Sequence, residues 1–316
     1  MKTLKKILKI LLLIVLIGVA WYYGTIWYHN YTSDKNAEGN VVKEDIKPED
    51  LGDKNEIKPY VDGELLFLLA GLDQNQGESG EHTRSDTLML VKLNFNTGET
   101  DVISIPRDTR VPVQGQLDKI NHAAAYDGLK LTIKTIRDWL NIDLDYYVKV
   151  NFESVEKVID IMGGVDIEVP EIMADWVGVE PGLQKLNGKQ ALKYVRYRKG
   201  YVDGDLGRVH AQQKFIKAFM DEITKAGNIA RAPVFIDLFF KEVDTNISYS
   251  YIVSKLPSAP NFGSSKLNTY TIPGDGQYVD GISYYLYFEE ETMELRDKVL
   301  KEYVMDEDYD ASKIDN

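Results

Sequence analysis

The sequence predicts an α/β (α+β-like) domain in which a central mixed β-sheet is flanked by helices. Three observations lead to this fold class. Short apolar runs typical of buried strands alternate along the chain with longer segments of helical spacing. Two strand-like runs, Leu88–Phe95 and Thr100–Ile105, are separated only by the turn residues 96–99, which indicates a hairpin. No internal repeat or second domain interrupts residues 61–305, the expected extent of the domain.

The first 28 residues are typical of a membrane anchor. Residues 1–9 hold four lysines and no acid, and residues 10–28 carry no charged side chain. Nineteen helical residues at about 1.5 Å each span roughly 29 Å, which is about one bilayer core. The basic head places the N-terminus in the cytoplasm and the domain outside the cell membrane. A cleaved signal peptide is the alternative, but Trp and Tyr crowd the place where small residues are expected.

Composition narrows the function classes further. Residues 29–60 are polar and acidic and predict a flexible linker, and residues 306–316 predict a disordered acidic tail. The net charge is −13, and it becomes −17 once the basic head is set aside. A domain this acidic excludes general nucleic-acid binding and requires any anion site to be local. The absence of cysteine excludes thiolate chemistry and cysteine-ligated metals.

The strands and helices follow in order along the domain. Glu64–Ala70 predicts a buried strand that delivers Asp73 at its C-terminal end, and Pro106 ends the hairpin's second strand just before Arg107. Further strands are expected at Tyr146–Val150, Val165–Val169 and Asn268–Ile272, with a turn at Pro273–Gly276. Helices are expected from about Lys119 to Leu140, at Phe152–Met162 with a Gly163-Gly164 cap, at Lys189–Arg198, at Leu206–Ala226 after an Asp205 N-cap, and at Glu289–Tyr303.

Arginine is concentrated in a few motifs. Only nine of the 37 basic residues are arginines, and five of these occur in three short motifs that also hold aspartates. These five are Arg84, Arg107, Arg196, Arg198 and Arg208. The planar guanidinium fork binds phosphate or carboxylate bidentately, which lysine does not do. The pattern predicts that these segments converge on a phosphorylated ligand with a divalent cation.

Each of these residues also has a plainer interpretation. Asp73 and Asp86 are expected at strand ends, where they could bind Mg²⁺ through oxygen or could be turn and cap residues. Arg107 could clamp a phosphate or pair with Asp108. Asp205 could be a base, an arginine partner or a helix cap.

The spacing of the remaining candidate residues shows which of them can lie on the same face of a helix. Arg196 and Arg198 are two residues apart, so they can converge only at a frayed helix end or in an extended segment. Arg208 and Gln212, four residues apart, share a helix face. His122 and His210 could be ligands or bases, but lone histidines in helices are more often structural.

Taken together, the motifs resemble the LytR-CpsA-Psr family of cell-envelope proteins over about residues 62–250. The matching pieces, in the family's order, are Gly71-Leu72-Asp73, Arg84-Ser85-Asp86-Thr87, Ser104-Ile105-Pro106-Arg107-Asp108-Thr109, Lys119-Ile120-Asn121-His122-Ala123, Gly163-Gly164-Val165, Leu186-Asn187-Gly188-Lys189-Gln190-Ala191-Leu192, Tyr197-Arg198, Asp205-Leu206-Gly207-Arg208 and Gln212-Gln213. The ordered set is specific, although no single piece is.

The resemblance implies a Mg²⁺-dependent phosphotransferase (Mn²⁺ being the other candidate metal) on the outer face of a bacterial membrane. Such enzymes move a glycopolymer, such as teichoic acid or capsule, from a polyprenyl-pyrophosphate carrier to peptidoglycan through a phosphodiester link. An apolar tunnel between sheet and helices would hold the prenyl chain. By motif match, Asp73 and Asp86 would bind the metal, while Arg84, Arg107, Arg196, Arg198, Arg208 and Gln212 would bind the pyrophosphate. Arg107, Asp205 and Arg208 would be the catalytic residues.

The sequence departs from the family pattern directly before the glutamine pair. Many members have an arginine there, whereas this chain has Ala211, and it also lacks an arginine often found in the loop after Asp73. Two other functions are left open. One is a non-catalytic polyprenyl-pyrophosphate-binding envelope regulator. The other is a hydrolase that uses the same residues, with water replacing the sugar acceptor.

Overall fold

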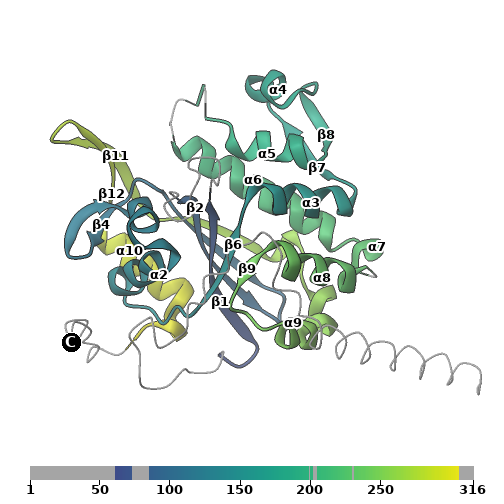
Figure 1. The fold of residues 1–316 in the computed structure, drawn as a ribbon, viewed down its shortest axis with the longest axis horizontal. Helices are drawn as coiled ribbons and strands as arrows, with labels where there is room; N and C mark the ends of the chain where they lie inside the picture. The colour runs from purple at the N-terminus through teal and green to yellow at the C-terminus, as the bar shows by residue number, and fades with distance from the viewer. Residues whose placement is uncertain (1–60, 73–84, 199, 202–204, 230, 306–316) are drawn as a thin grey trace, which may run out of the picture. The chain divides into compact units, whose positions relative to one another are not determined.

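The computed structural model describes residues 61–72, 85–198, 200–201, 205–229 and 231–305. The basic head, the expected anchor at residues 10–28, the linker and the tail lie outside them. In the described part, six strands form one sheet in the order β10–β3–β2–β1–β6–β9 (Figure 1). Their bounds are β1 Glu64–Leu72, β2 Ser85–Asn94, β3 Thr100–Ile105, β6 Tyr146–Val150, β9 Asp244–Thr245 and β10 Leu267–Thr271.

The strand directions confirm a mixed sheet. Strand β2 runs antiparallel to both of its neighbours, β1 and β3, while β6 is parallel to β1 and β10 is parallel to β3. The carboxyl ends of β1, β3, β6 and β10 therefore lie at the same edge, where β2 begins. This carboxyl edge is where loops of α/β sheets form ligand sites.

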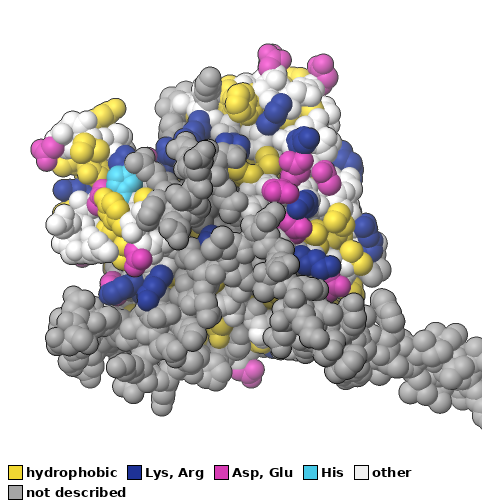
Figure 2. All heavy atoms as spheres, viewed as in Figure 1, with side chains coloured by type: hydrophobic (Ala, Val, Ile, Leu, Met, Phe, Trp, Pro, Cys, Tyr) yellow, Lys and Arg dark blue, Asp and Glu magenta, His cyan; other side chains and the backbone are white. Residues whose placement is uncertain are grey.

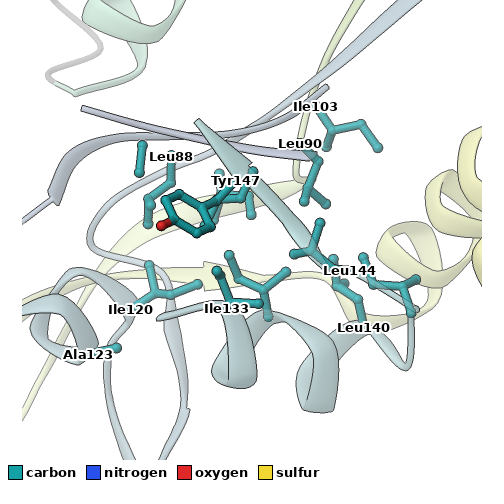
Figure 3. Packing of buried hydrophobic residues seen from close by; sticks show 14 of the residues in the cluster. Leu88, Leu90, Ile103, Ile120, Ala123, Ile133, Leu140, Leu144 and Tyr147 are labelled. Carbon is teal, nitrogen blue, oxygen red and sulfur yellow. The ribbon is translucent and has the colours of Figure 1, made fainter. Parts of the chain in front are cut away.

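Strand β1 is apolar at almost every position because both of its faces are covered. Leu66, Leu68 and Ala70 belong to a core that also contains Ile133 of α2 (Ile120–Leu140) and Val299 of α10 (Glu289–Leu300). Figure 3 shows side chains of this core, with the Tyr147 ring lying between the sheet and the helix. The alternate residues of β1 point to the other face, as the two-residue period of a strand requires.

Other helices cover that second face (Figure 1). Leu65, Phe67 and Leu69 lie in a cluster with residues of α8 (Ala232–Glu242) and α9 (Tyr249–Lys255). Ile216 of α6 (Asp205–Ile223) packs against the β2 and β3 residues beside it. The sequence prediction of a sheet between two helical layers is confirmed.

A second apolar cluster lies beyond the sheet. It joins α3 (Phe152–Met162), β7 (Val165–Val169), α4 (Glu171–Val177), β8 (Gly182–Leu186), α5 (Gly188–Arg196) and α6. The alternation in Val165–Val169 correctly predicted a strand, but it pairs with β8 in a separate two-stranded sheet. The helix Phe152–Met162 was also correctly bounded, and it ends at Gly163, whose φ of 89° is left-handed.

Two hairpins project from the carboxyl edge and were not predicted. They are β4 (Arg110–Val113) with β5 (Gln116–Lys119), and β11 (Gly274–Val279) with β12 (Ile282–Tyr287). The expected turn at Pro273–Gly276 is wrong in part, because β11 already begins at Gly274. The remaining segments are α7 (Ala226–Ile229) and the 3₁₀ turns Leu256–Asn261, Ser264–Lys266 and Lys301–Tyr303.

Helix α2 and helix α6 also differ from their predictions. Helix α2 is kinked at Asp127 and Gly128, where the backbone leaves helical geometry. Helix α6 begins at Asp205 itself rather than after it, a difference of one residue that boundary definitions leave open. No helix in the described ranges combines the length and apolarity needed to cross a membrane.

Candidate functional site

The predicted site residues belong to segments that meet at the carboxyl edge. Arg107 follows the end of β3 by two residues, and Asp86 is the second residue of β2, which starts at that edge. Phe152 follows β6, the parallel neighbour of β1. The topology of the sheet thus brings positions 86 and 152, which are 66 residues apart in the sequence, to one side of the sheet.

Of the two predicted metal ligands, only Asp86 is placed, and only through its backbone. Asp73 and Arg84 lie outside the described residues, and the side chains of Asp86 and Asp205 are likewise not described. Leu72 pairs with Ser85, and the next pair is Gly71 with Thr87, so the register skips Asp86 at a bulge. Bulges of this kind occur beside functional sites, where they redirect a side chain.

The divalent-cation site stays a prediction, and the strand register is the observation that bears on it. Position 73 directly follows Leu72, whose strand partner is Ser85, so positions 73 and 86 both adjoin a single paired position. Carboxylate oxygens are the ligands that Mg²⁺ prefers, and it keeps several of its ligands as water or phosphate. Within the described ranges, no group of three His, Asp or Glu side chains forms a further metal site.

Arg107 lies in a tight turn that β5 and α2 hold in place. The Thr109 N–H and hydroxyl both donate to the Pro106 carbonyl, at 3.0 and 2.5 Å, and the Asn121 N–H donates to the Arg107 carbonyl at 3.1 Å. The Arg107 Nε lies 3.6 Å from Asp108, whose other oxygen is 3.0 Å from Lys119 Nζ. The ion pair between Arg107 and Asp108 therefore exists, and the same carboxylate also contacts Lys119.

Helix α5 ends between the two neighbouring arginines. It begins with a capping box, in which Asn187 and Gln190 satisfy each other's backbone N–H groups. It ends at Arg196, because Tyr197 is extended with φ −63° and ψ 130°. Arg196 and Arg198 are both exposed, and the Arg196 guanidinium lies 4.1 Å from the Phe152 ring centroid. The two arginines are therefore not on one regular helix, as the prediction for a helix end required.

Helix α6 is fastened to the sheet by its glutamine pair. Gln212 Nε2 donates to the Thr87 hydroxyl at 3.1 Å and to the Val195 carbonyl at 3.4 Å. Gln213 Nε2 donates to Ser104, Tyr270 and Thr271 oxygens at 3.0 to 3.1 Å. Arg208, only 3% exposed, lies one turn before Gln212 on the same side of α6. These contacts connect α6, α5 and the start of β2.

Ala211, which stands where many family members have an arginine, lies in an apolar environment. Ala211 is buried in the second apolar cluster, where it lies with Tyr194 and Phe215, while His210 is exposed. A small apolar side chain at this position fills the cluster and supplies no cation to the edge.

Sequence reasoning missed several polar residues on the β4–β5 hairpin and the start of α2. Lys119 and Arg110 are the first of these, since lysine is too common in the chain to draw notice. Asp118 accepts hydrogen bonds from His122 Nδ1 at 2.9 Å and from the Tyr126 hydroxyl at 2.6 Å. Burial acts to raise the pKa of Asp118, but these hydrogen bonds outweigh burial and lower the pKa below its ordinary value.

A small hollow lies at the opposite end of the sheet. It is lined by Leu66, Tyr146 and Tyr303 together with the acids Asp143, Asp145 and Glu302. Its acidic lining repels a pyrophosphate, and none of the predicted site residues adjoins it. The apolar tunnel expected from the resemblance stays a prediction.

Comparison with known proteins assigns the chain to a family. The LytR-CpsA-Psr family model matches residues 25–301, so the chain belongs to this family. A relative from Bacillus licheniformis, named polyisoprenyl-teichoic acid–peptidoglycan teichoic acid transferase TagU, is 31% identical over 90% of this chain and 92% of its own.

Two solved structures share the fold. The crystal structure of Bacillus subtilis TagV is 30% identical, covers 75% of this chain and 97% of its own, and has a TM-score of 0.65. The family protein YwtF (TagT), with a bound octaprenyl pyrophosphate lipid, is 25% identical over 79% of this chain and 95% of its own, with a TM-score of 0.61.

Proposed function

We propose that this protein transfers a teichoic-acid-type glycopolymer from a polyprenyl-pyrophosphate carrier to peptidoglycan. The observation that carries the proposal is the meeting of Arg107, the Arg196–Arg198 helix end and the α6 segment at one sheet edge. A relative that matches 90% of this chain is named as a teichoic acid transferase, which supports the same reaction. Capsule and other secondary polymers are further candidates for the cargo.

The reaction breaks a phosphoanhydride bond of the pyrophosphate and forms a phosphate ester bond. A hydroxyl of the peptidoglycan sugar attacks the phosphorus that bears the polymer. The bond from that phosphorus to the bridging oxygen breaks, and prenyl phosphate leaves with the electron pair. Phosphoryl transfer of this kind depends on positioning and on neutralising charge more than on covalent catalysis.

The chain's own residues supply these two requirements. Arg107, Arg196, Arg198 and Arg208, with Arg84, hold the pyrophosphate oxygens, and Gln212 fixes the position of α6 against Thr87. Arg208 is buried, and the low dielectric around it strengthens its attraction for an anion. Asp205 accepts or orients the proton of the attacking hydroxyl in this proposal.

A divalent cation completes the proposal. Asp73 and Asp86 would hold Mg²⁺, or Mn²⁺ in its place, and the cation would neutralise charge on the pyrophosphate. The support for this assignment is the register that puts both positions beside the Leu72–Ser85 pair.

The protein is also proposed to be anchored in the cell membrane. Residues 10–28 anchor the chain in the membrane with the N-terminus in the cytoplasm, and the domain lies outside the cell beside its lipid-borne donor. Protease added to intact cells should degrade the domain, and survival of the domain would contradict this orientation.

The test uses the full-length protein in lipid nanodiscs with a synthetic prenyl-pyrophosphate saccharide and peptidoglycan fragments. Mass spectrometry would follow the phosphodiester-linked adduct with Mg²⁺ and with chelator. An adduct that requires metal and is lost in Asp86→Ala supports the transferase. Donor binding without adduct supports the regulator, and free phosphosugar alone supports the hydrolase.

A further inference from the structure

The β4–β5 hairpin places two basic side chains directly opposite each other. Its turn is formed by Gln114 and Gly115, both with positive φ, which matches the two-residue turns that suit twisted strands. This turn sets a register in which Arg110 pairs with Lys119. Residues directly opposite in an antiparallel pair share one face, so both cations project to the same side.

The ring of Tyr284 in β12 lies under both cations. The Arg110 guanidinium carbon is 5.3 Å from the ring centroid, and Lys119 Nζ is 5.6 Å from it. The Tyr285 N–H donates to the Asp108 carbonyl at 2.9 Å, which ties β12 to the turn that holds Arg107. The aromatic face orients the cations, since a ring quadrupole attracts positive charge without cancelling it.

The two cations differ in how their charge is balanced. Lys119 pairs with Asp108 at 3.0 Å, whereas Arg110 has no carboxylate partner among the described residues. Its Nε is buried and makes no hydrogen bond within the same part of the chain. Like charges placed directly opposite on a hairpin are destabilising. The hairpin nevertheless places Arg110 opposite Lys119. This destabilising arrangement indicates that an anionic ligand supplies the negative charge that Arg110 lacks.

The pair also lies close to the proposed reaction site. Arg110 follows Arg107 by three residues, so their Cα atoms are at most about 11 Å apart. Figure 2 shows basic and apolar side chains together at the surface over the β4–β5 and β11–β12 hairpins. A glycopolymer whose terminal phosphate is bound at Arg107 could therefore reach Arg110 within a few repeat units.

The chemistry favours one phosphodiester of a flexible polymer chain. A guanidinium fixed on a ring offers its remaining N–H groups to two oxygens of one anion. An extended anionic membrane is disfavoured because exposed acids surround the hairpins, including Asp275, Asp280 and Glu289. A single phosphodiester can lie on Arg110 and avoid these acids.

We infer that Arg110, oriented by Tyr284 beside Lys119, binds a backbone phosphate of the glycopolymer and so selects anionic polymers as cargo. This inference rests on the proposed function, because it adds a polymer subsite to the same reaction site. Arg110 is a specificity-determining residue in this view, since it contacts the polymer away from the phosphorus that reacts.

The first experiment compares two donors with the full-length protein in nanodiscs. One donor ends at its prenyl-pyrophosphate disaccharide, and the other carries three added glycerol phosphate units. We expect Arg110→Gln to raise KM for the extended donor about tenfold, the effect of losing one charge-assisted hydrogen bond. KM for the short donor and kcat for both should stay within about twofold. An equal change with both donors, or no change with either, would overturn the inference.

The matched control is Arg231→Gln. The Arg231 guanidinium also lies 5.3 Å from an aromatic ring centroid, that of Phe235, but on α8 rather than at the carboxyl edge. It should leave both donors unchanged. Arg110→Lys serves as a second variant that keeps the charge, and it should retain part of the preference for the extended donor. Thermal melting of each variant identifies any loss of folding.

The second experiment measures binding without turnover. Free tri(glycerol phosphate) is titrated into the full-length protein, with a neutral trisaccharide and anionic lipid vesicles as the other probes. We expect only the phosphate oligomer to depend on Arg110, and added salt should weaken its binding. If Arg110→Gln weakens only vesicle binding, the ligand is a membrane and the inference fails.

The two proposals can fail separately. Oligomer binding that depends on Arg110, in a protein that transfers neither donor, would keep the polymer subsite and refute the transferase. Transfer of both donors with no effect of Arg110→Gln would do the reverse.

Discussion

Two ends of the same sheet hold arginine in different ways. At the amino end of β6, Arg137 is fully buried, and its Nη1 lies 2.6 Å from Asp145 and 3.2 Å from Asp143. At the carboxyl edge, Arg196 and Arg110 lie over the rings of Phe152 and Tyr284. Carboxylates neutralise Arg137, whereas the ring under Arg110 leaves most of that guanidinium's charge available. The first arrangement stabilises the fold, and the second is suited to an anionic ligand.

The largest effect is expected from breaking the buried arrangement. Arg137→Met leaves Asp143 and Asp145 without their buried cation, so we expect a loss of about 3–5 kcal/mol in the free energy of unfolding. Urea denaturation measures this loss. The control Lys134→Met removes an exposed ion pair with Asp138 and should cost less than about 1 kcal/mol. A loss no larger than the control's would show that the pair is not structural.

Arg107→Lys should affect the reaction and spare the fold. Lysine keeps the charge but loses the bidentate fork, so we expect kcat/KM to fall about 100-fold with little change in unfolding free energy. Steady-state transfer assays measure this. Arg296→Lys is the control, since Arg296 pairs with its neighbour Asp297 and donates to the Leu140 carbonyl. Near-normal turnover of Arg107→Lys would remove Arg107 from the phosphate site.

Gly71→Ala tests the contact between β1 and β2 beneath α6. An added Cβ would lie 3.1 Å from the Thr87 Cβ, and Thr87 accepts the hydrogen bond from Gln212. We expect a several-fold loss of transfer and a stability loss of about 1 kcal/mol from overpacking. Gly227→Ala, which meets no atom within 4 Å, is the control. Unchanged transfer would separate the Thr87–Gln212 contact from function.

The smallest effect is expected from Phe152→Leu. Removing the ring under Arg196 should raise KM for the donor about 2- to 5-fold, because a cation–π contact at an exposed site contributes about 0.5–1 kcal/mol. The control Phe235→Leu removes the ring under Arg231 and should leave KM unchanged. If both variants behave alike, the ring-held arrangement at the carboxyl edge is not functional.

Local sequence was sufficient for elements whose pattern is strong. The apolar run of β1, the β2–β3 hairpin and the helix Phe152–Met162 were all predicted, because each has a clear period and a turn or glycine at its end. The β4–β5 hairpin was missed because its strands have only four residues each and one contains Pro112. Periodicity also does not say which sheet a strand joins, so the pairing of β7 with β8 in a separate two-stranded sheet was not predicted.

Part of the candidate site was predicted from the sequence, and part was missed. Clustering of a rare residue drew attention to Arg107, Arg196 and Arg208, and the structure brings their segments to one edge. Arg110 was overlooked because the hairpin that pairs it with Lys119 was not predicted. Its other contact, the ring of Tyr284, comes from a distant segment of the chain and leaves no local signal. The predictions for Asp73 and Arg84 fall outside the described residues and stay predictions.

The projecting hairpins have an evolutionary consequence. β4–β5 and β11–β12 each form a two-stranded sheet of their own, apart from the six-stranded one. An insertion or deletion in either hairpin therefore leaves the register of the central sheet intact. A lineage can in this way change the length and chemistry of the surface beside the reaction site and inherit the rest unaltered.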